Sequence, residues 1–129
     1  MENFEKNSAT VSVSTGEGLY DLSMLTDMDD KEYLVEILTI FLQETPVLMK
    51  EMKAAVSARK NDVVAAKAHK IKGGVGILQA GKLTGILEEI EIIAKMSGMN
   101  HELASLVESA GKQYSIIEAS LKKYLKEIS

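Results

Sequence analysis

Apolar residues recur every three or four positions through four long stretches of this 129-residue chain. Such spacing places them on one side of an α-helix, because each residue turns the helix by about 100°. Only short segments, near residues 59–61, 79–81 and 97–100, separate the stretches. Short connections between long amphipathic helices favour antiparallel neighbours. The sequence therefore predicts an all-α fold, an antiparallel up-down four-helix bundle.

The four long helices are expected over residues 29–58, 61–78, 82–96 and 101–127. Asp29 and Asp30 suit the cap and first turn of the first helix, and Asn61 or Asp62 suits the cap of the second. Pro46 lies inside the first helix and removes one backbone donor. Because the apolar spacing continues on both sides of Pro46, a kinked single helix is expected there.

The N-terminal region is expected to divide into two parts. Residues 1–18 are rich in Asn, Ser, Thr and Gly and contain few large apolar groups, which predicts a mobile N-terminal tail. Residues 20–25 predict a short extra N-terminal helix, capped near Asp21, that packs on the side or end of the bundle. The expected organisation is a flexible tail over residues 1–18 and a helical bundle domain over residues 19–129.

Composition argues against several classes of protein. The chain has no cysteine, two histidines and a formal net charge of −4. Without cysteine there is no disulfide or thiolate metal site, and neither histidine has the Glu three residues before it that a di-iron bundle needs. The acidic balance argues against general nucleic-acid binding. No apolar run reaches the length of about 18 residues that spans a membrane, and no signal peptide is evident. We therefore expect a cytoplasmic protein with no metal site and no membrane association.

The helix expected over residues 61–78 carries a histidine away from its apolar stripe. That stripe consists of Val64, Ala68, Ile71, Val75 and Leu78. On ideal geometry His69 lies about 140° from the centre of the stripe. The neighbours expected on this outer face are the small residues Ala65, Ala66, Gly73 and Gly76. The imidazole should therefore be accessible to another macromolecule.

Three glycines, at positions 73, 74 and 76, stand in a segment that should be helical. Glycine inside a helix costs about 1 kcal/mol relative to alanine, so helix stability alone does not explain them. Small residues instead permit close approach of another backbone or a bulky group. Residues 59–72 also carry five Lys or Arg against one acid, Asp62. An accessible imidazole with close-approach glycines and Lys72 nearby would suit a phosphoryl group on histidine.

The segment His69-Lys70-Ile71-Lys72-Gly73 resembles the motif of histidine-containing phosphotransfer (HPt) domains. The family pattern is His, any residue, an aliphatic residue, Lys and Gly, followed by small residues and a further aliphatic residue. Leu78 and Ala80 follow at matching distances.

Three positions depart from this pattern. Gly74 replaces a usual serine and is still small, Val75 lies on the apolar stripe, and Gln79 stands where the family usually has glycine. The order of helices over residues 19–127 resembles the family in a weaker form.

The resemblance implies a carrier of phosphoryl groups between aspartyl receiver domains in a two-component phosphorelay. His69 would be the phosphoacceptor through Nε2, Lys72 would stabilise the phosphoryl group, and Gly73 would allow close approach. The implied partner-binding residues are Ala65, Ala66, Lys67, Lys70 and Gly76. The two lysines of this set would steer an acidic receiver.

The resemblance also implies the partners, which would be response-regulator receiver domains and a hybrid sensor histidine kinase. Any Mg²⁺ required for transfer would bind to the receiver, so no cofactor is expected on this chain. We expect a monomeric phosphoryl carrier without an ATP site, not an enzyme that acts as a kinase by itself.

Other functions compete with this interpretation. Residues 76–83 nearly match a phosphate-binding P-loop, but Leu83 occupies the place of the Mg²⁺-binding Ser or Thr. A non-phosphorylated helical adaptor would dock partner proteins through the same face and would tolerate His69→Gln. An enzyme with His69 as general base lacks a second catalytic group at a suitable spacing.

Three glutamates and the second histidine are expected to have structural roles only. Glu88, Glu89 and Glu91 are expected to form a solvated helix face. His101 is expected in the first turn of the last helix, where its charged form is mildly unfavourable, and is interpreted as structural or incidental.

Overall fold

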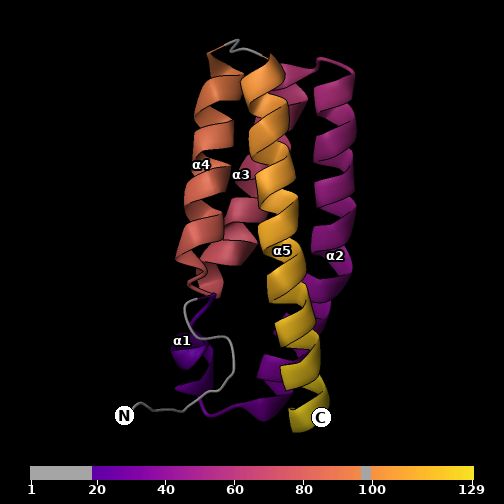
Figure 1. The fold of residues 1–129 in the computed structure, drawn as a ribbon. Coiled ribbons are helices and arrows are strands. Elements are labelled where there is room, and N and C mark those ends of the chain that lie inside the picture. Colours follow the sequence, from indigo (N-terminus) through magenta and orange to yellow (C-terminus); the bar gives the residue numbers. More distant parts are fainter. Residues whose placement is uncertain (1–18, 97–99) are drawn as a thin grey trace, which may run out of the picture.

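The structure is a computed structural model that describes residues 19–96 and 100–129. The helices in these ranges are α1 (Ser23–Thr26), α2 (Lys31–Ser57), α3 (Asn61–Ile77), α4 (Gly81–Lys95) and α5 (Asn100–Ile128). The predicted all-α fold is confirmed, because α2 to α5 form an up-down four-helix bundle (Figure 1). The mobile tail predicted for residues 1–18 lies outside the described residues.

The four long helices surround a single core. Helix α3 packs on both α2 and α4, while α5 packs on α4 and returns to α2, which closes the ring. Every long helix contributes side chains with almost no exposed surface, such as Leu38 and Met52 from α2, Ile71 from α3, Leu87 from α4 and Leu121 from α5. Burial of large apolar side chains, each worth about 1.5–3 kcal/mol, is the main stabilising contribution to such a bundle.

Helix α2 begins slightly later than predicted, because Asp30 is its cap residue and Asp29 lies before the helix instead of within it. The Asp30 carboxylate accepts a hydrogen bond of 3.0 Å from the backbone N–H of Tyr33, which satisfies one of the free donors of the first turn. The helix then continues through Pro46 to Ser57, so the prediction of one helix across the proline is confirmed. The apolar residues on both sides of Pro46 bury the same face against the core, and this burial outweighs the lost backbone hydrogen bond.

Helix α3 begins differently from its prediction. It starts at Asn61 with Lys60 at the cap position, and no side chain caps it. The expected capping role of Asn61 or Asp62 is therefore wrong, because both residues already lie within the helix. Asp62 instead lies in the first turn, where a negative charge interacts favourably with the helix dipole.

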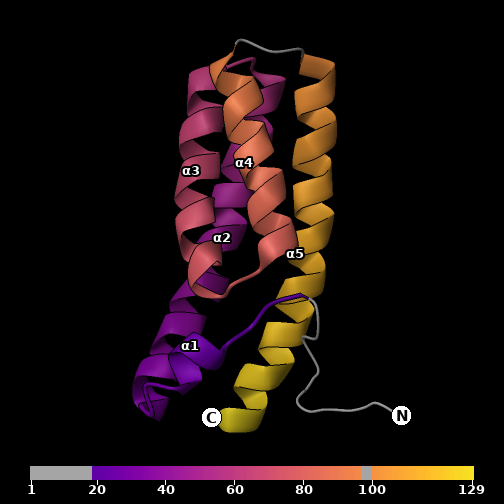
Figure 2. The ribbon, with the colours of Figure 1, turned by 90° about the vertical axis from the view of Figure 1, so that its left-hand side faces the viewer.

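Helices α2 and α5 are much longer than the two helices between them. They contain 27 and 29 residues, against 17 in α3 and 15 in α4. At about 1.5 Å per residue, their ends must extend well beyond the α3–α4 turn. Figure 2 shows α1 beside these extended ends, below that turn. The predicted extra helix therefore packs at the end of the bundle.

Polar contacts hold the segment around α1 in this position. The backbone N–H of Asp21 donates to the carbonyl oxygen of Leu78 at 2.8 Å, and the hydroxyls of Tyr20 and Ser120 lie 2.7 Å apart. The cap residue of α1 is Leu22, which makes no side-chain capping hydrogen bond, while the Asp21 carboxylate before it accepts from the backbone N–H of Ser23 at 2.9 Å. The helix itself has four residues and is shorter than predicted.

Three of the turns use a residue other than glycine with positive φ. These residues are Asp29, Arg59 and Gln79, with φ values of 54°, 58° and 53°. They follow α1, α2 and α3 respectively, where glycine is the usual residue because the left-handed region is strained for other side chains. Arg59 and Gln79 thus bound α3, the helix that carries the histidine of interest.

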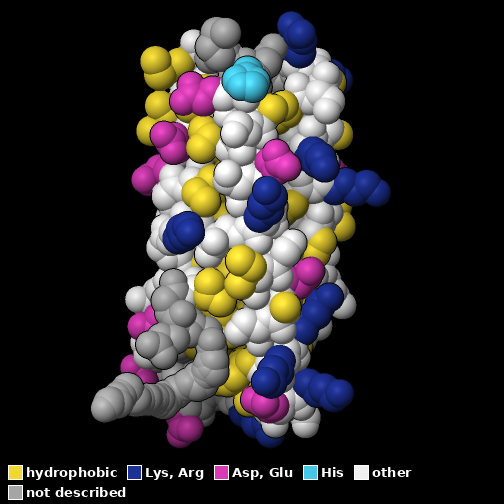
Figure 3. Space-filling view, viewed as in Figure 1, with side chains coloured by type: hydrophobic (Ala, Val, Ile, Leu, Met, Phe, Trp, Pro, Cys, Tyr) yellow, Lys and Arg dark blue, Asp and Glu magenta, His cyan; other side chains and the backbone are white. Residues whose placement is uncertain are grey.

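Charges of both signs are mixed on the face formed by α2, α4 and α5 (Figure 3). This face therefore lacks the continuous basic field typical of nucleic-acid binding. Among the described helices, none combines the length and apolar character needed to cross a membrane.

Candidate functional site

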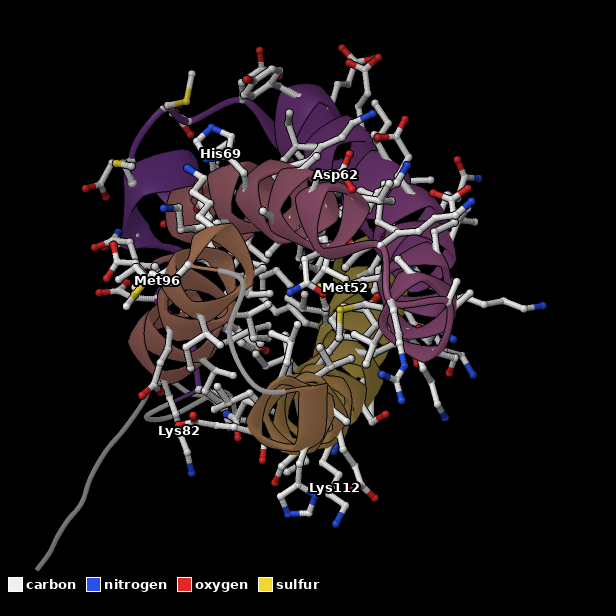
Figure 4. All side chains as sticks on the ribbon, turned by 90° about the horizontal axis from the view of Figure 1, so that it is seen from above. Met52, Asp62, His69, Lys82, Met96 and Lys112 are labelled. Atoms are coloured by element: carbon white, nitrogen blue, oxygen red, sulfur yellow. The ribbon has the colours of Figure 1, made fainter. Side chains whose placement is uncertain are left out.

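Helix α3 separates a buried side from an open one. Its buried residues include Val64, Ala68, Ile71 and Val75, which are the core of the predicted apolar stripe. The His69 side chain is 70% exposed. In the view down the bundle, His69 stands outside the ring of helices, whereas Met52 points into it (Figure 4). Periodicity therefore placed the histidine on the correct side of the helix.

One residue of the predicted outer face is misplaced. Ala66, Lys70, Gly73 and Gly76 are exposed, as expected from their positions on the helix. Ala65 is only 5% exposed and belongs to the core, so its assignment to the open face is wrong. In a closed ring each helix packs against two neighbours, and the buried arc is wider than the apolar stripe alone. Ala65 lies at the border of that arc.

The glycines of α3 fall into two kinds. A Cβ atom at Gly74 would lie 3.6 Å from Cδ1 of Phe41, so this position contacts the bundle. A Cβ atom at Gly73 or Gly76 would have nothing within 4 Å. Packing within the described part of the chain therefore does not require glycine at these two positions. Their cost of about 1 kcal/mol each relative to alanine needs another explanation.

The basic character predicted for this face is reduced by ion pairs. Lys67 Nζ lies 3.0 Å from Glu51 Oε1 of α2. Lys72 Nζ lies 3.1 Å from Glu91 Oε1 of α4, and 4.0 Å from Glu88 Oε2. Because their charges are partly neutralised by acids from neighbouring helices, these two lysines attract an acidic partner less than the sequence suggests. Lys70 is exposed and remains suited to that role.

The most informative residue of the site is Glu91. Its side chain is 10% exposed, so the prediction that it belongs to a solvated face is wrong. Its Oε2 atom lies 3.1 Å from Nδ1 of His69 and 2.8 Å from Nζ of Lys95. Its Oε1 atom forms an ion pair with Nζ of Lys72. One carboxylate thus joins the histidine to two lysines across the contact between α3 and α4.

These contacts determine the protonation state of Glu91. Hydrogen bonds from Lys95 and then Lys72 lower its pKa from the ordinary value of 4.5 to about 2, against the opposing effect of burial. Glu91 is therefore a carboxylate at neutral pH, and a carboxylate can only accept hydrogen bonds. The Nδ1 atom of His69 must then be the donor, so in the neutral ring the lone pair lies on Nε2.

The sequence contains a signal for Glu91, but an incomplete one. Glu91 follows Leu87 by four residues and precedes Ala94 by three, which places it at the edge of the apolar stripe of α4. Lys95 lies four residues further on, at the spacing of a helical ion pair. That Glu91 faces His69 depends on how α3 and α4 align, and no pattern within one helix gives this alignment.

The site can present a neutral imidazole as a nucleophile. Nδ1 is held by Glu91, Nε2 carries the lone pair, and Lys72 supplies a positive charge one turn along α3. Within residues 19–96 and 100–129, no group of three or more His, Asp or Glu side chains could hold a metal ion. His101, the second histidine of the chain, is exposed at the start of α5.

Comparison with protein-family models finds one family, and comparison with solved structures finds a similar fold. The model described as Hpt domain matches residues 36–128 of this chain. Among solved structures, the chain is similar to histidine-containing phosphotransfer protein B (HptB) from Pseudomonas aeruginosa PAO1, with a TM-score of 0.78 and 22% sequence identity. That match covers 84% of this chain and 96% of the other. Comparison with curated protein sequences gave no match.

Proposed function

Because the chain belongs to the Hpt domain family, we propose that it carries a phosphoryl group on His69 between aspartyl receiver domains of a phosphorelay. The observation that carries this proposal is the exposed His69 ring with Nδ1 held by buried Glu91. The ring is oriented by the protein on one side, and on the other side no hydrogen bond from the described residues reaches its nucleophilic nitrogen. A histidine that served only packing or solubility would need neither feature.

The neighbouring residues have separate roles in this proposal. Lys72 pairs with phosphoryl oxygens and offsets the negative charge that arrives on the ring. Gly73 and Gly76 leave the space in which the receiver brings its phosphorylated aspartate close to His69. Lys70 contributes to steering an acidic receiver.

The remaining components of the relay would come from the partners. A hybrid sensor histidine kinase would supply the phosphoryl group through its receiver domain, and a response regulator would accept it. Mg²⁺ would bind in the acidic pocket of the receiver. This chain would act as a carrier and would not itself catalyse phosphorylation from ATP.

The direct test is transfer from a phosphorylated receiver domain to this protein. We expect label that is stable in alkali and lost in acid, as for a phosphohistidine, on the wild type and on His101→Gln. His69→Gln should carry no label. Its helicity should match that of the wild type, and its free energy of unfolding should stay within about 0.5 kcal/mol of the wild-type value. His101→Gln is the matched control, because it removes the other exposed histidine.

Two results would contradict the proposal. Label on His69→Gln would place the phosphoryl group elsewhere. The non-phosphorylated adaptor would be favoured if the folded wild type accepts no label from several receivers. In that case the wild type and His69→Gln should also bind these receivers equally well.

A further inference from the structure

The Glu91 carboxylate raises a question about the proton on His69. A carboxylate that accepts from Nδ1 favours the neutral tautomer with hydrogen on Nδ1, which is a sufficient role for orienting the nucleophile. Two lysines on a carboxylate that is only 10% exposed are more than orientation requires. They keep Glu91 ionised, and an ionised partner also stabilises positive charge on the ring.

Resting on the proposed function, we propose that Glu91 is a positioning residue that retains the Nδ1 proton of His69 throughout phosphorylation and onward transfer. The ring would then neither lose nor gain a proton in either half of the cycle. Glu91 itself would stay ionised and would not touch the phosphoryl group.

Charge balance shows why the retained proton matters. In the first half, the Nε2 lone pair forms the N–P bond, and the P–O bond to the aspartyl carboxylate breaks with its electron pair leaving on that carboxylate. The ring, still protonated on Nδ1, becomes cationic beside Glu91. In the second half, a carboxylate oxygen of the next receiver attacks phosphorus, and the N–P electron pair returns to Nε2.

The ring therefore leaves as neutral imidazole with hydrogen on Nδ1, as it began. If the phosphorylated ring lost that proton, the leaving group would be an imidazolate anion. An imidazolate is strongly basic and leaves poorly, so transfer would slow until a proton returned. Retaining the proton keeps the phosphohistidine ready to transfer in both directions.

The surrounding charges fit this role. Among the described residues, the charged groups close to the His69–Glu91 pair are Lys72 from α3, and Glu88 and Lys95 from α4. When Lys72 turns to the phosphoryl oxygens, Lys95 still holds Oε2 of Glu91, the atom that accepts from Nδ1 at 3.1 Å. The partly buried position strengthens the attraction between the carboxylate and the ring, because water screens it less.

The test compares Glu91→Gln with Glu88→Gln. Both variants remove one negative charge from α4 near Lys72, but the Glu88 side chain is 61% exposed and its closest described charged contact is with Lys72, at 4.0 Å. Each protein is phosphorylated on His69, and the rate of transfer to one receiver is measured from pH 6 to 9. At each pH, the transfer rate of each variant is divided by the wild-type rate. Because the same receiver is used throughout, the receiver's own pH dependence cancels in this ratio.

We expect the ratio for Glu88→Gln to stay constant with pH. The ratio for Glu91→Gln should fall by about tenfold per pH unit once the phosphorylated ring loses its proton. A constant ratio for Glu91→Gln would overturn the inference, whatever the size of the overall rate change. If the wild type takes up no label on His69 at all, the proposed function itself is contradicted. The two failures are therefore distinguishable.

A spectroscopic measurement provides a second test that does not depend on rates. Nitrogen-15 NMR of the imidazole ring reports which nitrogen carries hydrogen. We expect hydrogen on Nδ1 of His69 before and after phosphorylation in the wild type and in Glu88→Gln at pH 8. In Glu91→Gln the phosphorylated ring should lose it at that pH. A deprotonated Nδ1 in the phosphorylated wild type would overturn the inference.

Discussion

The two sides of α3 are built on opposite principles. The inner side carries Val64, Ala68 and Val75, which have no exposed surface and belong to the hydrophobic core. The outer side carries Gly73 and Gly76, where an added Cβ would have no atom of the described residues within 4 Å. The inner side stabilises the fold, and the outer side leaves room for a partner. Residues one position apart on a helix can therefore serve stability and function almost independently.

The largest effect that tests this separation is the truncation of a core residue. Ile71→Ala on the inner side should lower the free energy of unfolding by about 2–5 kcal/mol, because it leaves a cavity in the core. Ile77→Ala on the same helix is the matched control and should cost far less, since Ile77 is 41% exposed. Urea denaturation measures both. If phosphoryl uptake per folded molecule fell with Ile71→Ala, the two sides would not be independent.

The next effect concerns the one residue that belongs to both sides. The pKa of Glu91 is lowered in the folded state, from 4.5 to about 2, so ionised Glu91 stabilises the fold above the unfolded-state value. That contribution should be lost as pH falls from about 4.5 to 2. Unfolding free energies of wild type and Glu91→Gln, measured against pH, should differ most near neutrality and converge in acid. A constant difference across this range would contradict the assigned pKa.

A smaller effect is expected from the outer glycines. Gly73→Ala should stabilise the protein by about 1 kcal/mol, because alanine favours the helix and the position is open. Gly73→Leu should also fold, but slow phosphoryl transfer by about 10²-fold, because the reacting groups are held apart. Gly85 of α4 is equally open, and Gly85→Leu is the control that should leave transfer unchanged. Normal transfer by Gly73→Leu would remove the close-approach explanation of the glycine.

The smallest effect is expected at the turn before α3, which belongs to neither side. Arg59 has a φ of 58°, a conformation that costs other residues more than glycine. Arg59→Gly should stabilise the fold by about 0.5 kcal/mol after the greater flexibility of the unfolded chain is included. Arg59→Ala keeps the strain and should show no such gain. Thermal unfolding measures both, and equal behaviour of the two variants would assign the effect to lost charge.

Sequence reasoning was most accurate where one helix contains all the information. The apolar spacing predicted each long helix and the continuous α2 across Pro46, and it placed His69 on the exposed side of α3. Each of these features depends on residues within a few turns of one another. Local geometry relates such residues directly.

Errors occurred where a neighbouring helix decides the environment. Ala65 and Glu91 were both expected on open faces, and both are buried. Their positions at the edges of the apolar stripes were correct, but an adjacent helix covers these edges. The free charge expected of Lys67 and Lys72 was overestimated for the same reason, because their partners Glu51 and Glu91 come from α2 and α4.

The sequence by itself determined the all-α architecture, the facing of α3 and the resemblance carried by residues 69–73. These follow from the helical period and from side-chain chemistry, which are properties of the chain at short range. Only the tertiary structure decided that Glu91 meets Nδ1 of His69 at 3.1 Å and that Lys95 holds the same carboxylate oxygen. That meeting depends on the relative rotation and height of α3 and α4, which the packing of the whole core sets.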